Sequence, residues 1–289
     1  MMKTAREKIS IALLIILSPI VVWSFLTLKT HSLYHPESTS YADPWTGIPN
    51  IALKKKIQNI YFTTVDKVRI NGWYVPPQPG KPSIVFAHGN GGNQGDRFDV
   101  LQAFVEQGYG FFSFDYRGYG KSRGTPSEAG LYHDLEAASL YLQQHGIPIK
   151  NQIAMGESLG SGVVVDVAAR TPYRAVVLYS ALSSAPAVAA HLRDQNGLGW
   201  LGFLPLSAIM QQHFDSLSKI NHIQSPLLIM HGDKDDMMPL TMPRMLLAKS
   251  TVRYKKLLII PGAGHNSIFQ IGRTTLLNEL NTLLNETKN

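Results

Sequence analysis

The sequence contains no cysteine among its 289 residues. A thiol nucleophile, a disulfide framework and a lipid anchor attached through cysteine are therefore excluded. Basic residues are in excess, giving a net charge of +7, but their run at Lys54-Lys55-Lys56 is short and fits a solvated surface. Nucleic-acid binding requires a dense basic face with interleaved aromatic residues, so we expect no nucleic-acid partner.

Motifs for metal ions and nucleotides are also missing. There is no H-E-x-x-H pair and no Cys/His ligand set, so the sequence predicts no catalytic zinc. Gly120-Lys121-Ser122 ends like a phosphate-binding loop, but Asp115 occupies the earlier position that requires glycine. The acidic cluster at 233–236 lacks the late glutamate of an EF-hand loop, which argues against calcium. We therefore expect neither a metal nor a cofactor.

One long uncharged apolar stretch occupies residues 9–28, and Lys3, Arg6 and Lys8 precede it. Its length of about twenty residues matches the hydrocarbon thickness of a bilayer. By the positive-inside rule, segment 1–28 is then a membrane signal anchor with a cytoplasmic amino terminus. The rest of the chain would be translocated, to the periplasm or to a lumenal or extracellular space.

Two other interpretations of this stretch stay open. A cleaved signal peptide would release a secreted protein, although its apolar region is usually shorter and no A-x-A-like site lies within residues 23–32. A buried helix of a soluble protein would carry a polar stripe. Residues 29–56, with scattered proline, serine and lysine, are expected to form a tether that partly packs on the domain that follows.

From residue 57 to residue 289 the sequence alternates between strand-like and helix-like segments. An antiparallel hairpin is expected over 57–65 and 68–75. Further strands are expected at 83–87, 110–114, 153–156, 175–179, 227–230 and 256–260, and helices at 96–107, 128–145, 159–170, 240–250 and 267–284. Such alternation produces a mainly parallel central sheet with helices on both faces, so we expect one large α/β domain.

The segment Gly156-Glu157-Ser158-Leu159-Gly160 joins a strand-like run to a helix-like run. A serine at the apex of a sharp strand-to-helix turn is held in strained geometry with its hydroxyl pointing out of the sheet. Glycines on either side are needed because a side chain there would collide with the neighbouring strand or helix. We therefore predict that Ser158 is a catalytic nucleophile.

A serine hydroxyl needs a base within hydrogen-bond reach, and a carboxylate to orient that base. Asp235 follows the 227–230 strand and is the predicted acid, whereas Asp233 is expected to bond the turn and Asp236 to be solvated. His265 follows the next strand in a glycine-rich loop and is the predicted general base. The three residues thus occur in the order serine, acid, histidine, each in a loop that follows a strand.

The oxyanion that forms during acyl transfer needs preorganised hydrogen-bond donors. One predicted donor is the backbone N–H of Leu159, at the positive end of its helix. The other should come from the glycine-rich loop 88–93, where Asn90 N–H is the first choice and Gly91 N–H the next. His88 is expected to bond within its own loop.

The stretch of about 182–224 interrupts the alternation and is too long for a plain connection. It combines Trp200, Phe203 and other apolar residues with glycines and prolines. We expect a short helical lid over the carboxyl ends of the strands, the alternative being an ordinary extra helix that packs elsewhere.

With these residues in place, the chain resembles the α/β-hydrolase-domain proteins that are carried on one amino-terminal membrane helix. That group includes depalmitoylase-like acyl-protein thioesterases and their bacterial relatives. The matching pieces, which span about residues 57–270, are His88-Gly-Asn-Gly-Gly-Asn93, Asp115-Tyr-Arg-Gly-Tyr-Gly-Lys-Ser-Arg-Gly124, Gly156-Glu-Ser-Leu-Gly-Ser161, His213-Phe-Asp-Ser216, His231-Gly-Asp-Lys-Asp235 and Gly264-His265. The resemblance implies the α/β-hydrolase fold and the triad Ser158, Asp235 and His265.

The resemblance and the residues together predict a membrane-anchored serine hydrolase that cleaves a carboxylic ester or thioester through an acyl-enzyme. Its partners would be the acyl substrate and, through residues 9–28, the membrane. A peptidase or amidase on the same triad, and a catalytically silent binding protein on the same fold, are the alternatives. Glu157 departs from the resemblance, which more often has arginine there, and leaves the substrate preference open. The chain also lacks the cysteine-rich amino terminus of some relatives, so its anchor would be the helix.

Overall fold

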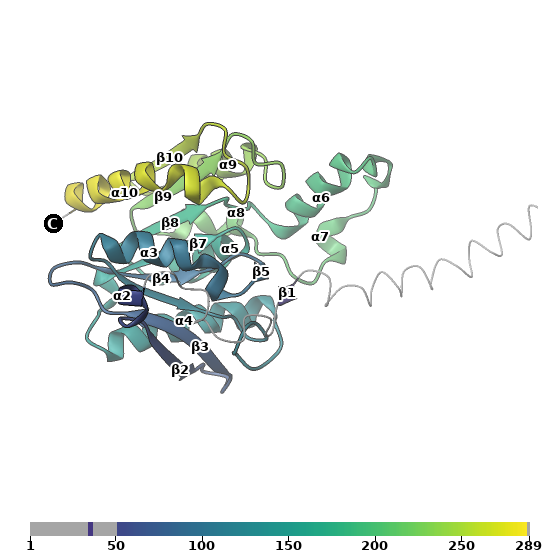
Figure 1. Cartoon of the computed structure of the whole chain (residues 1–289). Helices are drawn as coiled ribbons and strands as arrows, with labels where there is room; N and C mark the ends of the chain where they lie inside the picture. Colours follow the sequence, from purple (N-terminus) through teal and green to yellow (C-terminus); the bar gives the residue numbers. More distant parts are fainter. Residues whose placement is uncertain (1–33, 37–50, 288–289) are drawn as a thin grey trace, which may run out of the picture.

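The computed structural model describes residues 34–36 and 51–287 of the chain (Figure 1). The expected membrane segment at 9–28 and most of the expected tether lie outside these residues. Across the two described ranges, no helix combines the length and the apolar character needed to cross a membrane.

An eight-stranded sheet forms the centre of the molecule, in the order β10-β9-β8-β7-β4-β6-β3-β2. The strands are β2 (Gln58–Thr63), β3 (Arg69–Val75), β4 (Ser83–Ala87), β6 (Gly110–Phe114), β7 (Gln152–Glu157), β8 (Ala175–Tyr179), β9 (Leu227–Gly232) and β10 (Lys255–Ile260). Strand β3 pairs antiparallel with β2 and with β6, and all other neighbours are parallel. The predicted hairpin and the mainly parallel α/β-hydrolase sheet are therefore confirmed.

Helices cover both faces of the sheet (Figure 1). They are α3 (Phe98–Glu106), α4 (Glu128–Gln144), α5 (Leu159–Ala168), α9 (Thr241–Lys249) and α10 (Ile268–Glu286). Successive strand residues point to opposite faces, so Ile84 and Phe86 join the core under α3 and α10, whereas Val85 joins the core under α4, α5 and α9. Burial of the continuous apolar strands on both sides explains why their sequence does not alternate.

The expected helix over 96–107 begins instead as a 3-10 turn at Gln94–Arg97, followed by α3. Asn93 causes the difference, because its side chain accepts the Gly95 N–H at 2.9 Å while the Asp96 carboxylate accepts the Asn93 N–H at 2.9 Å. This reciprocal capping fixes the chain where it leaves the glycine-rich loop.

The expected lid region contains α6 (Ala185–Gln195), a 3-10 turn at Gly199–Leu201 and α7 (Leu206–Ile209), which project from the body (Figure 1). It then returns through α8 (Ser216–Lys219) and a 3-10 turn at Ile220–His222. The projection leaves and re-enters the body at one place, since Ala185 N–H donates to the His213 carbonyl at 2.7 Å. We use the name lid for residues 185–212.

Two parts of the expected tether pack on the domain. Tyr34 is 5% exposed and Leu53, in α2 (Ile51–Lys54), is 4% exposed, and each belongs to one of the two cores. The two-residue strand β1 (His35–Pro36) pairs in parallel with β5 (Gly91–Gly92) in the glycine-rich loop. The folded unit therefore includes residues that precede the expected domain start at 57.

Candidate active site

Ser158 lies at the tip of a sharp turn between β7 and α5. Its backbone has φ 50° and ψ −116°, a left-handed conformation that is strained for a residue with a side chain. A Cβ atom at Gly156 or at Gly160 would collide with backbone atoms, of Gly160 in the first case and of Ala87 in the second. Both glycines thus have the steric role expected from the sequence, and the turn depends on them.

His265 faces Ser158 from the loop that follows β10. Its Nε2 lies 3.1 Å from Ser158 Oγ, and its Nδ1 lies 2.9 Å and 3.0 Å from the two carboxylate oxygens of Asp235. The loop is fixed by the Gly264 N–H, which donates to Ser267 Oγ at 3.0 Å. The structure therefore brings the serine, histidine and acid that were predicted as a triad into one continuous hydrogen-bonded chain.

Asp235 is 8% exposed and is held by its own turn after β9. Its Oδ1 accepts the N–H groups of Met237 at 3.1 Å and Met238 at 2.8 Å. Burial raises the pKa of the carboxyl, but the hydrogen bond and charge of His265 and the backbone donors outweigh it, so the pKa is lowered overall. Asp235 is therefore ionised and can orient an imidazole.

The neighbouring acids lie elsewhere. Asp233 accepts the Gly262 N–H at 2.7 Å and ties the β9 loop to the β10 loop, while Asp236 is exposed. These positions agree with the expectation that Asp233 bonds the turn and that Asp236 is solvated.

The two predicted oxyanion donors belong to different segments, the turn at Ser158 and the loop 88–93. Leu159 is the first residue of α5, so its N–H has no partner within the helix and lies at the positive end of the helix dipole. The loop 88–93 reaches the turn through the Gly89 N–H, which donates to Glu157 Oε2 at 3.1 Å. Asn90 is oriented by Tyr119, whose hydroxyl donates to Asn90 Oδ1 at 2.9 Å. The donor role of the Leu159 and Asn90 N–H groups stays a prediction.

His88 is buried at the start of this loop, with Nδ1 2.7 Å from the Gly89 carbonyl. Burial, and after it the charge of Arg97, lowers the pKa of His88 to about 4. The imidazole is therefore neutral near pH 7, and it bonds within its own loop as expected.

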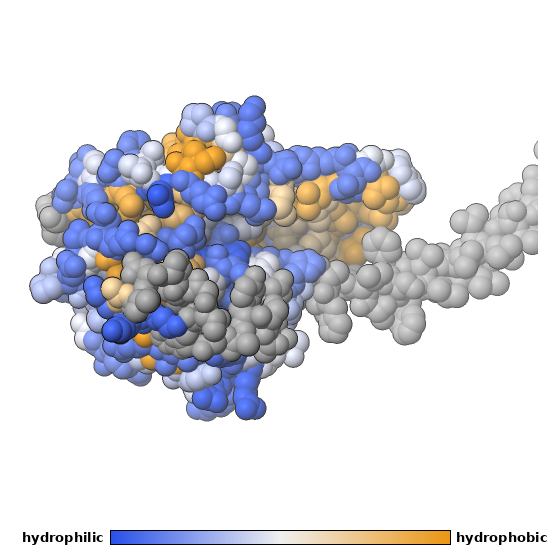
Figure 2. Space-filling view, viewed as in Figure 1, coloured by the Kyte–Doolittle hydropathy of each residue, from blue (hydrophilic) through white to orange (hydrophobic). Residues whose placement is uncertain are grey.

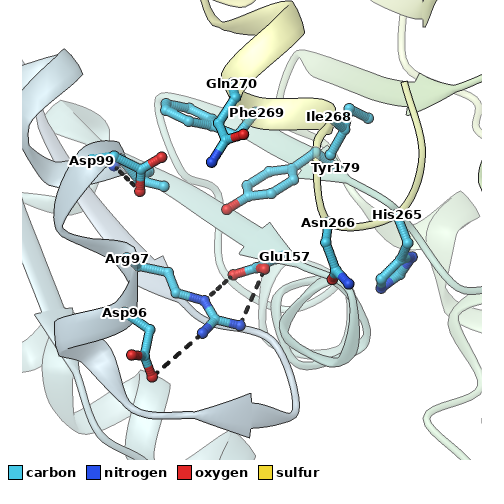
Figure 3. Close-up of a pocket in the computed structure, with 11 residues that line it drawn as sticks. Asp96, Arg97, Asp99, Glu157, Tyr179, His265, Asn266, Ile268, Phe269 and Gln270 are labelled. Atoms are coloured by element: carbon cyan, nitrogen blue, oxygen red, sulfur yellow. Dashed lines mark hydrogen bonds and ion pairs between the residues drawn. The ribbon is translucent and has the colours of Figure 1, made fainter. Parts of the chain in front are cut away.

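The sequence did not reveal the partner of Glu157. Arg97 donates to the Glu157 carboxylate through Nε at 2.9 Å and Nη2 at 3.3 Å (Figure 3). The ion pair borders a pocket of about 260 Å³ next to His265, and Tyr179 and Phe269 form its apolar side (Figure 3). The pairing had no local signal in the sequence, because 60 residues separate the two partners. The only hint was that Glu157 stands where the resembled family more often has arginine.

No metal site is evident beside these groups. Within residues 34–36 and 51–287, no three His, Asp or Glu side chains gather as they would around a metal ion.

Comparisons with known proteins agree with this architecture. A family model described as "Serine aminopeptidase, S33" matches residues 78–218, which include loop 88–93 and Ser158. The uncharacterized protein Rv2307c of Mycobacterium tuberculosis is 32% identical over 233 residues, covering 80% of each chain. The chain belongs to the α/β-hydrolase family.

A human relative and a solved structure are also similar to this chain. Human "Alpha/beta hydrolase domain-containing protein 17B" is 34% identical over 195 residues, which cover 67% of this chain and 63% of the human protein. The structure of the Pyrococcus furiosus esterase Pf2001 superposes with a TM-score of 0.70 at 19% identity, covering 88% of this chain and 98% of the esterase. At that identity the esterase supports the fold alone.

Proposed function

We propose that this α/β hydrolase is a serine hydrolase that cleaves an acyl ester or thioester through a covalent acyl-enzyme. Ser158 is the nucleophile, His265 the general base and Asp235 the residue that orients and stabilises the imidazole. The observation that carries the proposal is the uninterrupted chain from Ser158 Oγ through both ring nitrogens of His265 to the Asp235 carboxylate. Each link is within the range expected of a working triad.

In the first half of the reaction, Ser158 Oγ bonds to the acyl carbon while its proton passes to His265 Nε2. The negative charge on the former carbonyl oxygen is received by the N–H groups of Leu159 and Asn90. The bond to the alcohol or thiol then breaks, and the leaving group takes the proton from His265. In the second half, a water molecule attacks the acyl-enzyme with the same base, releasing the acid and restoring Ser158.

The lid supports an apolar acyl group as the substrate. Leu198, Trp200 and Phe203 are 44%, 71% and 73% exposed around the tip of the lid, and Figure 2 shows an apolar surface on this projection. Moving an acyl chain out of a membrane costs about 0.8 kcal/mol per methylene unless an apolar surface receives it. We therefore propose a medium or long acyl chain, as in the thioesterase group that the sequence resembles.

The apolar residues on the lid also bear on where in the cell the protein lies. We propose that residues 9–28 anchor the protein in a membrane, with the hydrolase domain on the translocated side. Exposed apolar residues on the lid would then lie near the bilayer surface, where a lipid-derived substrate is found. Cleavage of the segment as a signal peptide remains the alternative.

A substrate panel tests the function. The full chain in detergent should hydrolyse esters and thioesters, with kcat/KM rising from acetyl to medium or long chains, and Ser158→Ala should abolish the activity. Faster turnover of aminoacyl amides than of any ester would establish the peptidase alternative instead. A folded protein with no hydrolysis and no fluorophosphonate adduct would support the silent alternative. A fragment starting at residue 57 is unsuitable, because Tyr34 and Leu53 are part of the core.

A further inference from the structure

A short segment near the amino terminus is fixed on the domain next to the active site. Tyr34 is buried, its ring meets the Phe214 ring edge-on at 6.4 Å, and its hydroxyl donates to Gln212 Oε1 at 3.1 Å. The same Gln212 oxygen accepts the Glu128 N–H at 2.6 Å. Tyr34 thus attaches the segment to the base of the lid, with both an apolar and a polar contact.

The two residues that follow Tyr34 hold the loop that carries a predicted oxyanion donor. His35 pairs with Gly91 and Pro36 with Gly92 in the β1–β5 ladder. In addition, the His35 N–H donates to Asn90 Oδ1 at 3.3 Å. The side chains of His35 and Pro36 are exposed, so the contact with the loop is made by backbone.

Loop 88–93 needs such support because of its composition. Three of its six residues are glycine, and Gly92 has a left-handed φ of 75°, so the free loop has many accessible conformations. Glu157 fixes the loop at Gly89, and the β1 strand fixes it at Gly91 and Gly92. Asn90 lies between these two attachments. Its N–H would therefore be positioned from both sides.

We propose that Tyr34–Pro36 is a strap that positions loop 88–93, which carries the predicted oxyanion donor Asn90. This inference rests on the proposed serine hydrolase function. The strap touches neither Ser158 nor His265 in any contact described above, so it acts through Asn90 and the two glycines. Donors that stabilise an oxyanion must be in place before the reaction, and a displacement of about 1 Å can cost about a hundredfold in rate. Loosening the strap should therefore lower kcat and leave substrate binding nearly unchanged.

A pair of substitutions at one residue isolates the backbone contact. In the full chain, His35→Pro removes the N–H that donates to Asn90, whereas His35→Ala keeps it and removes only an exposed side chain. We expect His35→Pro to lower kcat by about tenfold or more with KM within about twofold, and His35→Ala to behave like wild type. The kcat values are divided by the Ser158 concentration titrated with a fluorophosphonate, so that unfolded protein does not count.

A transition-state analogue provides the second readout. A trifluoromethyl ketone forms an oxyanion adduct with the active serine, so His35→Pro should weaken its inhibition by the same factor that it lowers kcat/KM. Tyr34→Phe, which keeps the packing, should retain more of the activity than Tyr34→Ala.

Three results would overturn the strap. These are equal kcat for His35→Pro and His35→Ala, a rise in KM at constant kcat, or unchanged inhibition by the ketone. Failure of the proposed function is separate, since the wild-type chain would then show no titratable Ser158 or would cleave amides faster than any ester.

Discussion

The candidate active site, at the carboxyl ends of the strands, and the lid are built by opposite means. In the candidate active site, Ser158 and Asp235 are each 8% exposed, and both are within hydrogen-bond distance of His265. On the lid, Trp200 and Phe203 are 71% and 73% exposed, and their apolar surface faces outward. Buried, hydrogen-bonded groups determine which reaction is possible, whereas exposed apolar groups influence which molecule is brought to it. Substitutions in the candidate active site should therefore affect kcat, and substitutions on the lid should affect KM.

The largest effect is expected at the nucleophile. Ser158→Ala should lower kcat by at least about a thousandfold, because only the oxyanion donors and substrate binding would remain. The melting temperature should stay close to wild type, since the substitution removes one oxygen atom. Ser161→Ala is the matched control, in which loss of the 2.6 Å bond to the Ser158 carbonyl should lower stability more than activity. Near-normal turnover in Ser158→Ala, together with loss of turnover in a folded Ser161→Ala, would show that Ser161 rather than Ser158 is the nucleophile.

The next largest effect is expected at the acid. Asp235→Asn should lower kcat by about a hundredfold to ten-thousandfold, because an amide favours the wrong imidazole tautomer. Asp233→Asn changes the same functional group two residues away, where it meets the Gly262 N–H, and should cost less than about tenfold. Steady-state kinetics on a short soluble ester measures both. Equal loss in the two folded variants would show that the acid is not Asp235 alone.

A smaller effect is expected from the ion pair that borders the pocket. The Arg97 and Glu157 side chains are 18% and 20% exposed and share two hydrogen bonds. A double-mutant cycle with Arg97→Gln and Glu157→Gln should give a coupling of about 1–2 kcal/mol in the free energy of unfolding. Urea denaturation of the four proteins measures it. Additive losses would mean that the pair is no more than a screened surface contact.

The smallest effect is expected on the lid, and only for long substrates. Replacing Trp200 and Phe203 with Ser should raise KM for medium or long acyl esters by about three- to tenfold, and for acetyl esters by less than about twofold. Met245 and Ile271 are exposed apolar residues outside the lid, so their replacement with Ser is the control. If both double variants behaved alike, or acetyl esters were cleaved best by all forms, a small soluble ester would replace the lipid-like substrate.

The sequence predicted most of the fold because its signals are local. The four residues after Ser83, up to Ala87, are all apolar, and the structure buries this run on both faces as β4. Each of the predicted triad residues, Ser158, Asp235 and His265, follows a strand. Because the carboxyl ends of parallel strands lie along the same side of a sheet, the proximity of these three residues could be inferred without coordinates. The chemical roles of these residues remain predictions until the variants are measured.

Other features depend on contacts that no local pattern encodes. Tyr34 is a single aromatic residue in a polar segment, without the periodicity that would indicate burial, yet it packs against Phe214. The pairing of Arg97 with Glu157 likewise joins residues far apart in the chain. The start of the helix after loop 88–93 was misplaced for a different, local reason, because reciprocal capping by Asn93 and Asp96 changes the first turn.

The most direct test of the proposed triad is to locate the reactive serine. The full chain, in detergent, is treated with a fluorophosphonate, digested, and analysed by mass spectrometry. If Ser158 is the nucleophile and His265 its base, one adduct forms, on Ser158; it disappears in Ser158→Ala and forms at least about a hundredfold more slowly in His265→Ala. An adduct on another serine, or labelling of Ser158 at an unchanged rate without His265, would contradict it.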